Sequence, residues 1–226
     1  MKKFFTLISL LLIGCVSGQA ENTALARIAP PPPAPIIKAP ASKAASLYEV
    51  PTSQEAVAFV KDLVQKGQEV ANRPGDHQQE FGELLRDNFV TDEIAKFVLG
   101  SKWRSMAAEQ RARFQKIYEK RLVKINSDSE KVNTFRDSTP TIFEAATPQI
   151  DGSVLVKSDF TSKSKPNDPP AKIAFKVVKK SGLLKILDIL FENVSKLIAE
   201  RNEYGSIWSQ QGNDPERFLK FLESTL

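Results

Sequence analysis

The 226-residue sequence predicts an α+β fold in which helices come first, an antiparallel meander follows and two helices close the chain. Three observations predict it. Apolar residues keep helical spacing from about residue 53 to residue 125, alternate with polar residues in 153–162 and 171–180, and return to helical spacing after residue 193. We therefore expect a sheet with one apolar and one solvated face.

The first 20 residues read as a signal peptide, because two lysines precede an apolar run at 4–14 that is too short to span a bilayer. Two processing routes are open. Small residues before Glu21 fit cleavage after Ala20, whereas the sequence at 12–15 resembles a lipobox that would leave Cys15 as a lipidated N-terminus. Either route takes the protein out of the cytoplasm.

Residues 21–51 are rich in proline and alanine and include four consecutive prolines at 30–33, which predicts an extended spacer ahead of a single domain at 52–226. Cys15 is the only cysteine, so the domain is expected to have neither a disulfide nor a thiol nucleophile. Without Lys2 and Lys3 the chain has 30 basic and 27 acidic residues. An excess of +3 is too small to indicate nucleic-acid binding.

Four helices are expected before the sheet. Thr52 and Glu55 form a capping-box pattern at the start of the first, and Gly100 is placed to end the third. Ser105 is a candidate cap for a long helix whose stripe contains Phe114, Ile117, Tyr118, Leu122 and Ile125. The expected helices are 52–72, 76–89, 91–100 and a long one after Ser105.

The chain then changes to a period of two, and returns to helix after a break at Glu192–Asn193, where Asn193 is a candidate N-cap. Asp214 followed by Pro215 is typical of a last helix start. The expected strands are 131–137, 141–147, 153–162, 171–180 and 183–191, and the expected closing helices are 194–210 and the one after Asp214.

Residues for catalysis are few. His77 is the one histidine and is expected at the surface, without a metal-ligand partner at helical spacing. Asp188 and Glu192 could act as an acid–base pair, but acids at a helix start also stabilise its free N–H groups. Ser195 lacks a nucleophile-elbow sequence. We expect no metal, no cofactor and no enzymatic activity.

Two segments carry a family resemblance. FVLGSKWRSMAAEQRARFQKIYEKRL (97–122) and DILFENVSKLIAERNEYGSIWSQQGNDPERFLKFL (188–222) resemble patterns of the MlaC/toluene-tolerance family of periplasmic phospholipid-binding proteins. The resemblance covers about residues 52–226. Asn193 stands where the family usually has glycine, and asparagine tolerates the backbone angles of such a turn.

The resemblance implies a twisted antiparallel sheet, shaped like a nuclear-transport-factor-like cone and wrapped by helices around a deep apolar cavity for acyl chains. It implies a monomeric periplasmic carrier of a Gram-negative envelope that moves phospholipid between an outer-membrane lipoprotein complex and an inner-membrane ABC transporter with an MCE-domain ring. Such a role maintains outer-membrane lipid asymmetry. Candidate lining residues, for which a filled core is the alternative, are Phe97, Trp103, Tyr118, Val154, Val156, Phe160, Ile173, Phe175, Val177 and Val194.

Arg201 continues the apolar stripe of Val194, Leu197 and Ile198, so its guanidinium must reach a partner or water. It could hold a lipid phosphate at the cavity mouth, or form an ion pair with Asp188 or Glu192. Two other classes of function stay open beside the carrier. One is a structural or interaction protein of the envelope, lipid-anchored through Cys15 and filled by its own side chains, and the other is an enzyme on the same cone.

Overall fold

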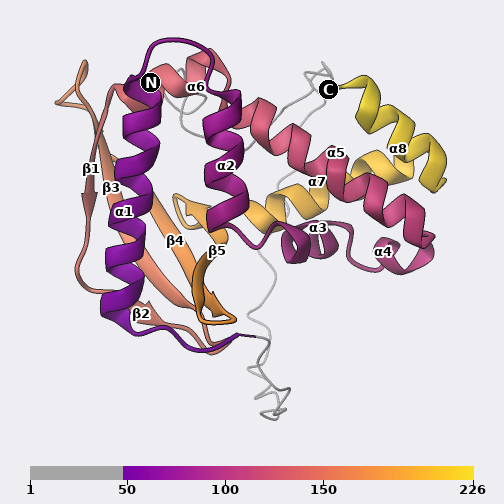
Figure 1. The fold of residues 1–226 in the computed structure, drawn as a ribbon, viewed down its shortest axis with the longest axis horizontal. Coiled ribbons are helices and arrows are strands. Elements are labelled where there is room, and N and C mark those ends of the chain that lie inside the picture. Colours follow the sequence, from indigo (N-terminus) through magenta and orange to yellow (C-terminus); the bar gives the residue numbers. More distant parts are fainter. Residues whose placement is uncertain (1–47) are drawn as a thin grey trace, which may run out of the picture.

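The computed structural model describes residues 48–226 (Figure 1). The predicted signal peptide, the lipobox with Cys15 and the spacer as far as residue 47 lie outside the described residues. The helices are α1 (Ser53–Asn72), α2 (Gln78–Asn88), α3 (Thr91–Leu99), α4 (Lys102–Ser105), α5 (Ala108–Asn126), α6 (Ser129–Arg136), α7 (Lys196–Gln210) and α8 (Pro215–Ser224). The strands are β1 (Ser138–Ile142), β2 (Thr147–Pro148), β3 (Val154–Ser162), β4 (Ala171–Lys180), β5 (Leu183–Phe191) and β6 (Val194–Ser195).

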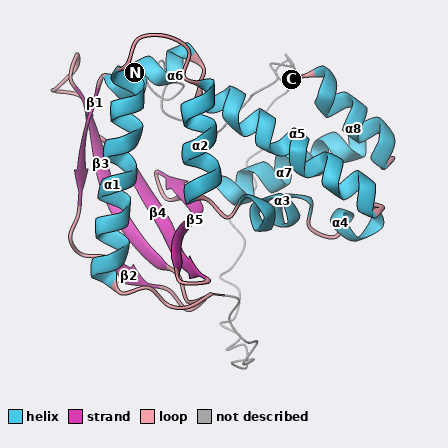
Figure 2. Ribbon diagram, viewed as in Figure 1, coloured by secondary structure: helices cyan, strands magenta, loops and turns pink. Residues whose placement is uncertain are grey.

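The six strands form one open, antiparallel sheet in the order β1-β3-β4-β5-β6, with the short β2 paired to β3. Helix α1 lies along this sheet with α2 beside it, and the remaining long helices gather at one side (Figures 1 and 2). The predicted α+β class is confirmed. Glu49 already pairs with Lys179 of β4, so contact with the sheet begins before residue 52.

Helix α1 begins as the sequence predicts. The Thr52 hydroxyl accepts the Glu55 N–H at 3.2 Å, and the Glu55 carboxylate accepts the Thr52 N–H at 2.8 Å. These two hydrogen bonds satisfy donors that a helix start otherwise leaves unpaired. Because Ala56, Val60 and Val64 recur at helical spacing, one buried stripe faces the sheet.

The alternation in the two central strands gives the predicted facing. Val156 is paired with Phe175 in the β3–β4 register, and the side chains of both are buried in the same cluster. Lys157, one residue along, is exposed on the other side of β3. The solvated face is less uniform than expected, because Val178 of β4 is also fully buried there, against the helices at the side.

Two predictions about the middle of the chain are wrong. Residues 131–137 were expected to form a strand, but 129–136 is helix α6, started by the Asp128 carboxylate, which accepts the N–H groups of Glu130 and Lys131. The strand expected at 141–147 is instead the separate β1 and β2. Segments this short carry too few residues to separate a period of 2 from one of 3.6.

Helix boundaries also differ where polar side chains compete for the cap. Helix α5 starts after Ala107, whose N–H is accepted by the Gln110 side chain, while Ser105 ends the short α4 and its hydroxyl donates to the Lys102 carbonyl.

The predicted position of His77 is also wrong. It was expected at the surface, but it is only 7% exposed at the start of α2, with its ring edge-on to Phe81.

The break between β5 and α7 is a tight hairpin rather than a direct strand-to-helix turn. Glu192 and Asn193 have φ of 48° and 65°, and the residues on either side of them pair as β5 and β6. Two consecutive positive φ values are typical of a two-residue type I′ turn, which asparagine tolerates. Asn193 therefore shapes the turn, and the cap of α7 is Ser195, whose hydroxyl accepts the Ile198 N–H at 3.1 Å.

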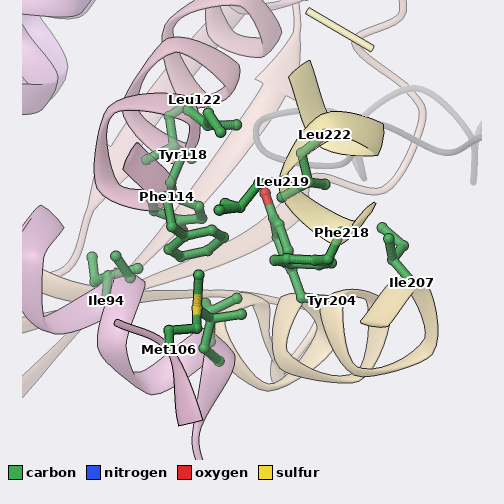
Figure 3. Close-up of a cluster of buried hydrophobic side chains, with 14 of the residues drawn as sticks. Ile94, Met106, Phe114, Tyr118, Leu122, Tyr204, Ile207, Phe218, Leu219 and Leu222 are labelled. Atoms are coloured by element: carbon green, nitrogen blue, oxygen red, sulfur yellow. The ribbon is translucent and has the colours of Figure 1, made fainter. Parts of the chain in front are cut away.

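Two apolar clusters stabilise the described chain. The first joins α3, α5, α7 and α8 around Phe114, which is in ring contact with Tyr118, Tyr204 and Phe218 at centroid distances of 5.7–5.9 Å (Figure 3). Phe114, Phe218, Leu219 and Leu222 in this cluster are 0% exposed. The second cluster lies between α1 and the sheet, and this one contains open space.

Candidate functional site: an apolar cavity between the sheet and the first two helices

The cavity lies in the second cluster, between α1, α2, α6 and the face of β3, β4 and β5. The space open to the centre of a water-sized sphere is about 120 Å³, and the total empty volume including the open mouth is about 890 Å³. The enclosed part is smaller than most small-molecule sites, which fall between about 300 and 1,000 Å³, and the larger figure includes open solvent. The lining residues are Leu63, Val64, Gly67, Phe81, Leu84, Leu85, Phe89, Asn126, Phe135, Phe160, Ile173, Phe175, Ile189, Phe191 and Lys196.

The wall is almost entirely hydrocarbon. Thirteen of the fifteen lining residues are apolar, counting Gly67, and the two others are Asn126 and Lys196. The Asn126 amide donates to the Leu122 carbonyl at 2.7 Å, so that donor is already satisfied within α5. A space walled in this way favours hydrocarbon chains over water or polar solutes.

Gly67 keeps this space open on the α1 side. A Cβ atom at Gly67 would lie 3.1 Å from Cε1 of Phe135, which is closer than ordinary contact. The absence of a side chain therefore lets α6 approach α1 and bring its phenyl ring to the cavity wall. Because Gly67 itself lines the cavity, a side chain added there would enter this space.

Three of the ten predicted lining residues are on the cavity wall: Phe160, Ile173 and Phe175. Val154, Val156 and Val177 belong to the same buried cluster and are 0% exposed, but they do not line the cavity. They form the filled part of the core beneath it. The period-two pattern therefore selects the correct face without distinguishing open from filled positions along it.

The other four predicted residues lie elsewhere. Tyr118 is buried in the first cluster and lines a separate hollow of about 30 Å³, and Trp103 of α4 is half-buried against the same cluster. Phe97 is 38% exposed and Val194 is 63% exposed, at the surface around α3 and the β5–β6 turn. These residues were predicted from apolar patterns that face the first cluster or solvent rather than the cavity.

The other twelve wall residues were not predicted: Leu63, Val64, Gly67, Phe81, Leu84, Leu85, Phe89, Asn126, Phe135, Ile189, Phe191 and Lys196. A signal existed for α2, in which Phe81, Leu84 and Leu85 have the spacing of one helix face. The spacing predicts burial but does not name the partner surface.

A small polar cluster closes the cavity where the two apolar clusters meet. The Lys196 ammonium lies 3.4 Å from Glu200 Oε1, and the Tyr118 hydroxyl donates to Glu200 Oε2 at 2.5 Å. Burial raises the pKa of the Glu200 carboxyl, despite the nearby lysine, and it raises the pKa of Tyr118 as well. A smaller hollow of about 30 Å³ beside this cluster shares Leu85 and Phe89 with the cavity.

Arg201 is exposed, and its guanidinium carbon lies 4.8 Å from the centre of the Phe97 ring. It is not among the lining residues of the cavity. Within residues 48–226 it forms no ion pair with Asp188 or Glu192, so that expected pairing is wrong. Stacking on an aromatic face and access to water together satisfy its charge.

Asp188 and Glu192 serve the backbone and are not an acid–base pair. Asp188 accepts the Ser195 hydroxyl at 2.6 Å and the Leu197 N–H at 3.0 Å, and burial raises its pKa. Glu192 accepts the Lys172 N–H at 2.9 Å, about 13 Å further along the strand direction. Both hydrogen-bond sets hold the β5–α7 junction together.

Among residues 48–226 there is no group of three or more acidic, histidine or cysteine residues placed to hold a metal ion. No helix in that range is both long and apolar enough to cross a membrane.

The described residues thus form an α+β protein in which helices cover an open antiparallel sheet and enclose a cavity with a hydrocarbon wall. The sequence matches the family model described as MlaC protein over residues 54–224, about three quarters of the chain. The chain belongs to the MlaC family.

Several solved protein chains are similar to this one. Among them is a phospholipid-binding protein from Ralstonia solanacearum in complex with a phospholipid, with a TM-score of 0.58 and 20% sequence identity over 75% of this chain and 95% of that one. At this identity the likeness establishes the fold. Comparison with curated protein sequences finds no significant match.

Proposed function

We propose that the protein binds a phospholipid by its acyl chains and carries it through the periplasm. The observation that supports this most directly is the cavity itself, which has a hydrocarbon wall and an enclosed volume of about 120 Å³ that continues into an open mouth. Family membership and the phospholipid in the structurally similar Ralstonia protein point the same way. The alternative is an envelope protein whose core is filled by its own side chains. It agrees with the first apolar cluster, whereas the second cluster contains open space.

The energetics favour carriage over permanent storage. Two acyl chains of about 16 carbons each, at about 0.8 kcal/mol per methylene, correspond to roughly 25 kcal/mol of burial relative to water. A bilayer supplies nearly the same free energy. The cavity therefore has to match a membrane interior, and exchange with either membrane is then close to balanced.

We further propose the partners that the family resemblance implies, an outer-membrane lipoprotein complex and an inner-membrane ABC transporter with an MCE-domain ring. The protein would be a carrier between them and not an enzyme. If the chain is cleaved after Ala20, the Pro-rich segment before residue 52 would be the N-terminal end of a freely diffusing carrier. If Cys15 is lipidated, the segment would tether the domain to the membrane. Detergent-phase partitioning of the full chain and of Cys15→Ser separates these two forms.

Mass spectrometry of organic extracts from the purified protein tests the central proposal. We expect phospholipid at about one molecule per chain after expression in a Gram-negative host. Protein that is folded, purified without detergent and free of lipid, and that takes none from vesicles, would contradict it.

A further inference from the structure

A surface that is both cationic and apolar lies on α3 and on α7, which pack against each other, and on β6, which leads into α7 (Figure 1). Three of the seven large apolar side chains that residues 48–226 expose lie here, and two of these three, at 55% and 63%, keep more than half of their area in water. We call this surface the α3–α7 patch. It consists of Lys96, Phe97, Lys102, Val194, Ile198 and Arg201.

Arg201 is held at the centre of the patch by α3. Its guanidinium carbon lies 4.8 Å from the centre of the Phe97 ring, and a Cβ atom at Gly100 would lie only 2.7 Å from its Nη2 atom. The missing side chain at Gly100 therefore lets the guanidinium lie against the end of α3. Within residues 48–226 this ring contact is its one interaction, so its N–H donors stay available to an anion outside the chain.

The charge of the patch is positive. Residues 94–108 include three basic residues and no acidic ones, and in the described part of the chain Lys96 and Lys102 form no ion pair. Lys102 reaches α7, where its Nζ would lie 3.7 Å from a Cβ added at Gly205. The acids of the neighbouring segment are engaged or turned inward, Glu192 with the Lys172 N–H, Glu200 with Tyr118, and Glu203 half-buried.

The patch continues into the wall of the apolar cavity. Val194 pairs with Phe191 across the β5–β6 turn, and Phe191 lines the cavity. Paired residues on neighbouring strands place their side chains next to each other. Lys196, two residues after Val194, also lines the cavity. A surface that docks on the patch therefore lies beside this end of the cavity.

We propose that the α3–α7 patch docks the protein on the anionic surface of a phospholipid membrane, with Phe97, Val194 and Ile198 among the headgroups and the patch cations on their phosphates. The proposal rests on the proposed function and adds the surface from which lipid is taken. Exposed apolar side chains among cations match the boundary between headgroups and acyl chains, where both kinds of group are satisfied. An acidic protein would satisfy the cations but would not itself supply lipid to the adjoining cavity.

The test uses the full secreted chain with Cys15→Ser, so that no acyl anchor holds it on the vesicles. Flotation measures its partition onto vesicles of phosphatidylcholine, with and without phosphatidylglycerol. We expect binding that requires phosphatidylglycerol and falls with added salt. Arg201→Gln and Ile198→Ser should each weaken the partition about fivefold, the usual effect of one cation or one partly inserted apolar side chain.

The amount of lipid that each variant holds at equilibrium should remain that of the wild type, because neither Arg201 nor Ile198 is on the cavity wall. Ile150→Ser and Lys157→Gln are the matched controls. Ile150 is fully exposed between β2 and β3, and Lys157 is exposed on β3. Both variants should bind vesicles like the wild type.

The outcomes separate the docking surface from the proposed function. Protein that holds lipid but does not bind the anionic vesicles, or binds them equally well in the Arg201 and Ile198 variants, overturns the docking surface and leaves the carrier function intact. Equal weakening by Lys157→Gln assigns the binding to net charge and also overturns it.

A photoreactive residue at position 198 gives a second measurement in cells. Cross-links to phospholipid support the docking surface, whereas cross-links to an acidic protein and none to lipid assign the patch to a protein partner and overturn it. Protein that binds vesicles through the patch but never contains lipid supports the docking surface and contradicts the carrier function alone.

Discussion

Gly67 offers the sharpest test of the cavity, because a side chain there must enter it. Its missing Cβ would lie 3.1 Å and 3.4 Å from Cε1 and Cζ of Phe135, so a longer side chain is directed into the space beside that ring. In Gly67→Met four heavy atoms occupy room that lipid methylenes would fill. Displacing three to four methylenes at about 0.8 kcal/mol each costs about 3 kcal/mol, or roughly a hundredfold in lipid affinity.

The effect on stability should be small by comparison. Replacing a helical glycine stabilises the fold by about 0.5–1 kcal/mol, whereas crowding against Phe135 costs about 1–3 kcal/mol. We expect a net loss of at most about 2.5 kcal/mol in the free energy of unfolding, which leaves the protein folded at room temperature. Thermal unfolding, followed by circular dichroism, measures this loss of stability separately from lipid loading.

Gly205→Met is the matched control. Gly205 is also a helical glycine, in α7, and the nearest side-chain atom to its missing Cβ is the flexible end of Lys102 at 3.7 Å. It should gain the same helix propensity and load lipid normally. If Gly67→Met binds as much lipid per chain as Gly205→Met, acyl chains do not occupy this cavity and the reasoning is refuted.

Three further predictions follow from the same contacts. Phe175→Glu, on the cavity wall, should abolish lipid loading while Lys157→Glu on the opposite face keeps it, and equal lipid content in extracts of the two would disprove the assigned facing. Arg201→Gln should leave lipid loading unchanged. It should lower the free energy of unfolding, measured by denaturant titration, by about 0.5–1 kcal/mol, the usual size of an exposed cation–π contact. Reduced loading would instead favour a role of Arg201 in binding the lipid phosphate. Because burial holds the pKa of Glu200 above its ordinary 4.5, the folded state keeps a proton that the unfolded state releases, so stability should fall as pH rises above about 4.5. Glu200→Gln should flatten that part of a melting-temperature profile against pH, and a profile parallel to the wild type would exclude the assignment.

The sequence determines the local features of this fold. The Thr52–Glu55 box starts α1 and Asp214 starts α8, where its carboxylate accepts the Glu216 and Arg217 N–H groups. Alternation in β3 and β4 is long enough to set which side chains are buried, since nine or ten residues repeat a period of two several times. Both kinds of signal act within one turn or one strand.

Other local assignments fail because they depend on competing partners. Asn193 and Ser195 are both acceptable helix caps by residue type. Pairing of β5 with β6 places Asn193 in the turn and leaves Ser195 to cap α7, with Asp188 supporting it from the strand. The same holds for residues 131–137, where the cap at Asp128 and contact with α1 favour helix.

The sequence by itself determined the class, the buried face of the sheet and, through two motifs, the family. Only the tertiary structure decided which buried side chains border open space. Phe114 and Phe175 both belong to apolar patterns in the sequence, but Phe114 packs into the first cluster while Phe175 faces the cavity. The physical reason is that an apolar stripe fixes only that a side chain leaves water, whereas a cavity depends on how elements distant in sequence approach one another, as α1 and α6 do at Gly67 and Phe135.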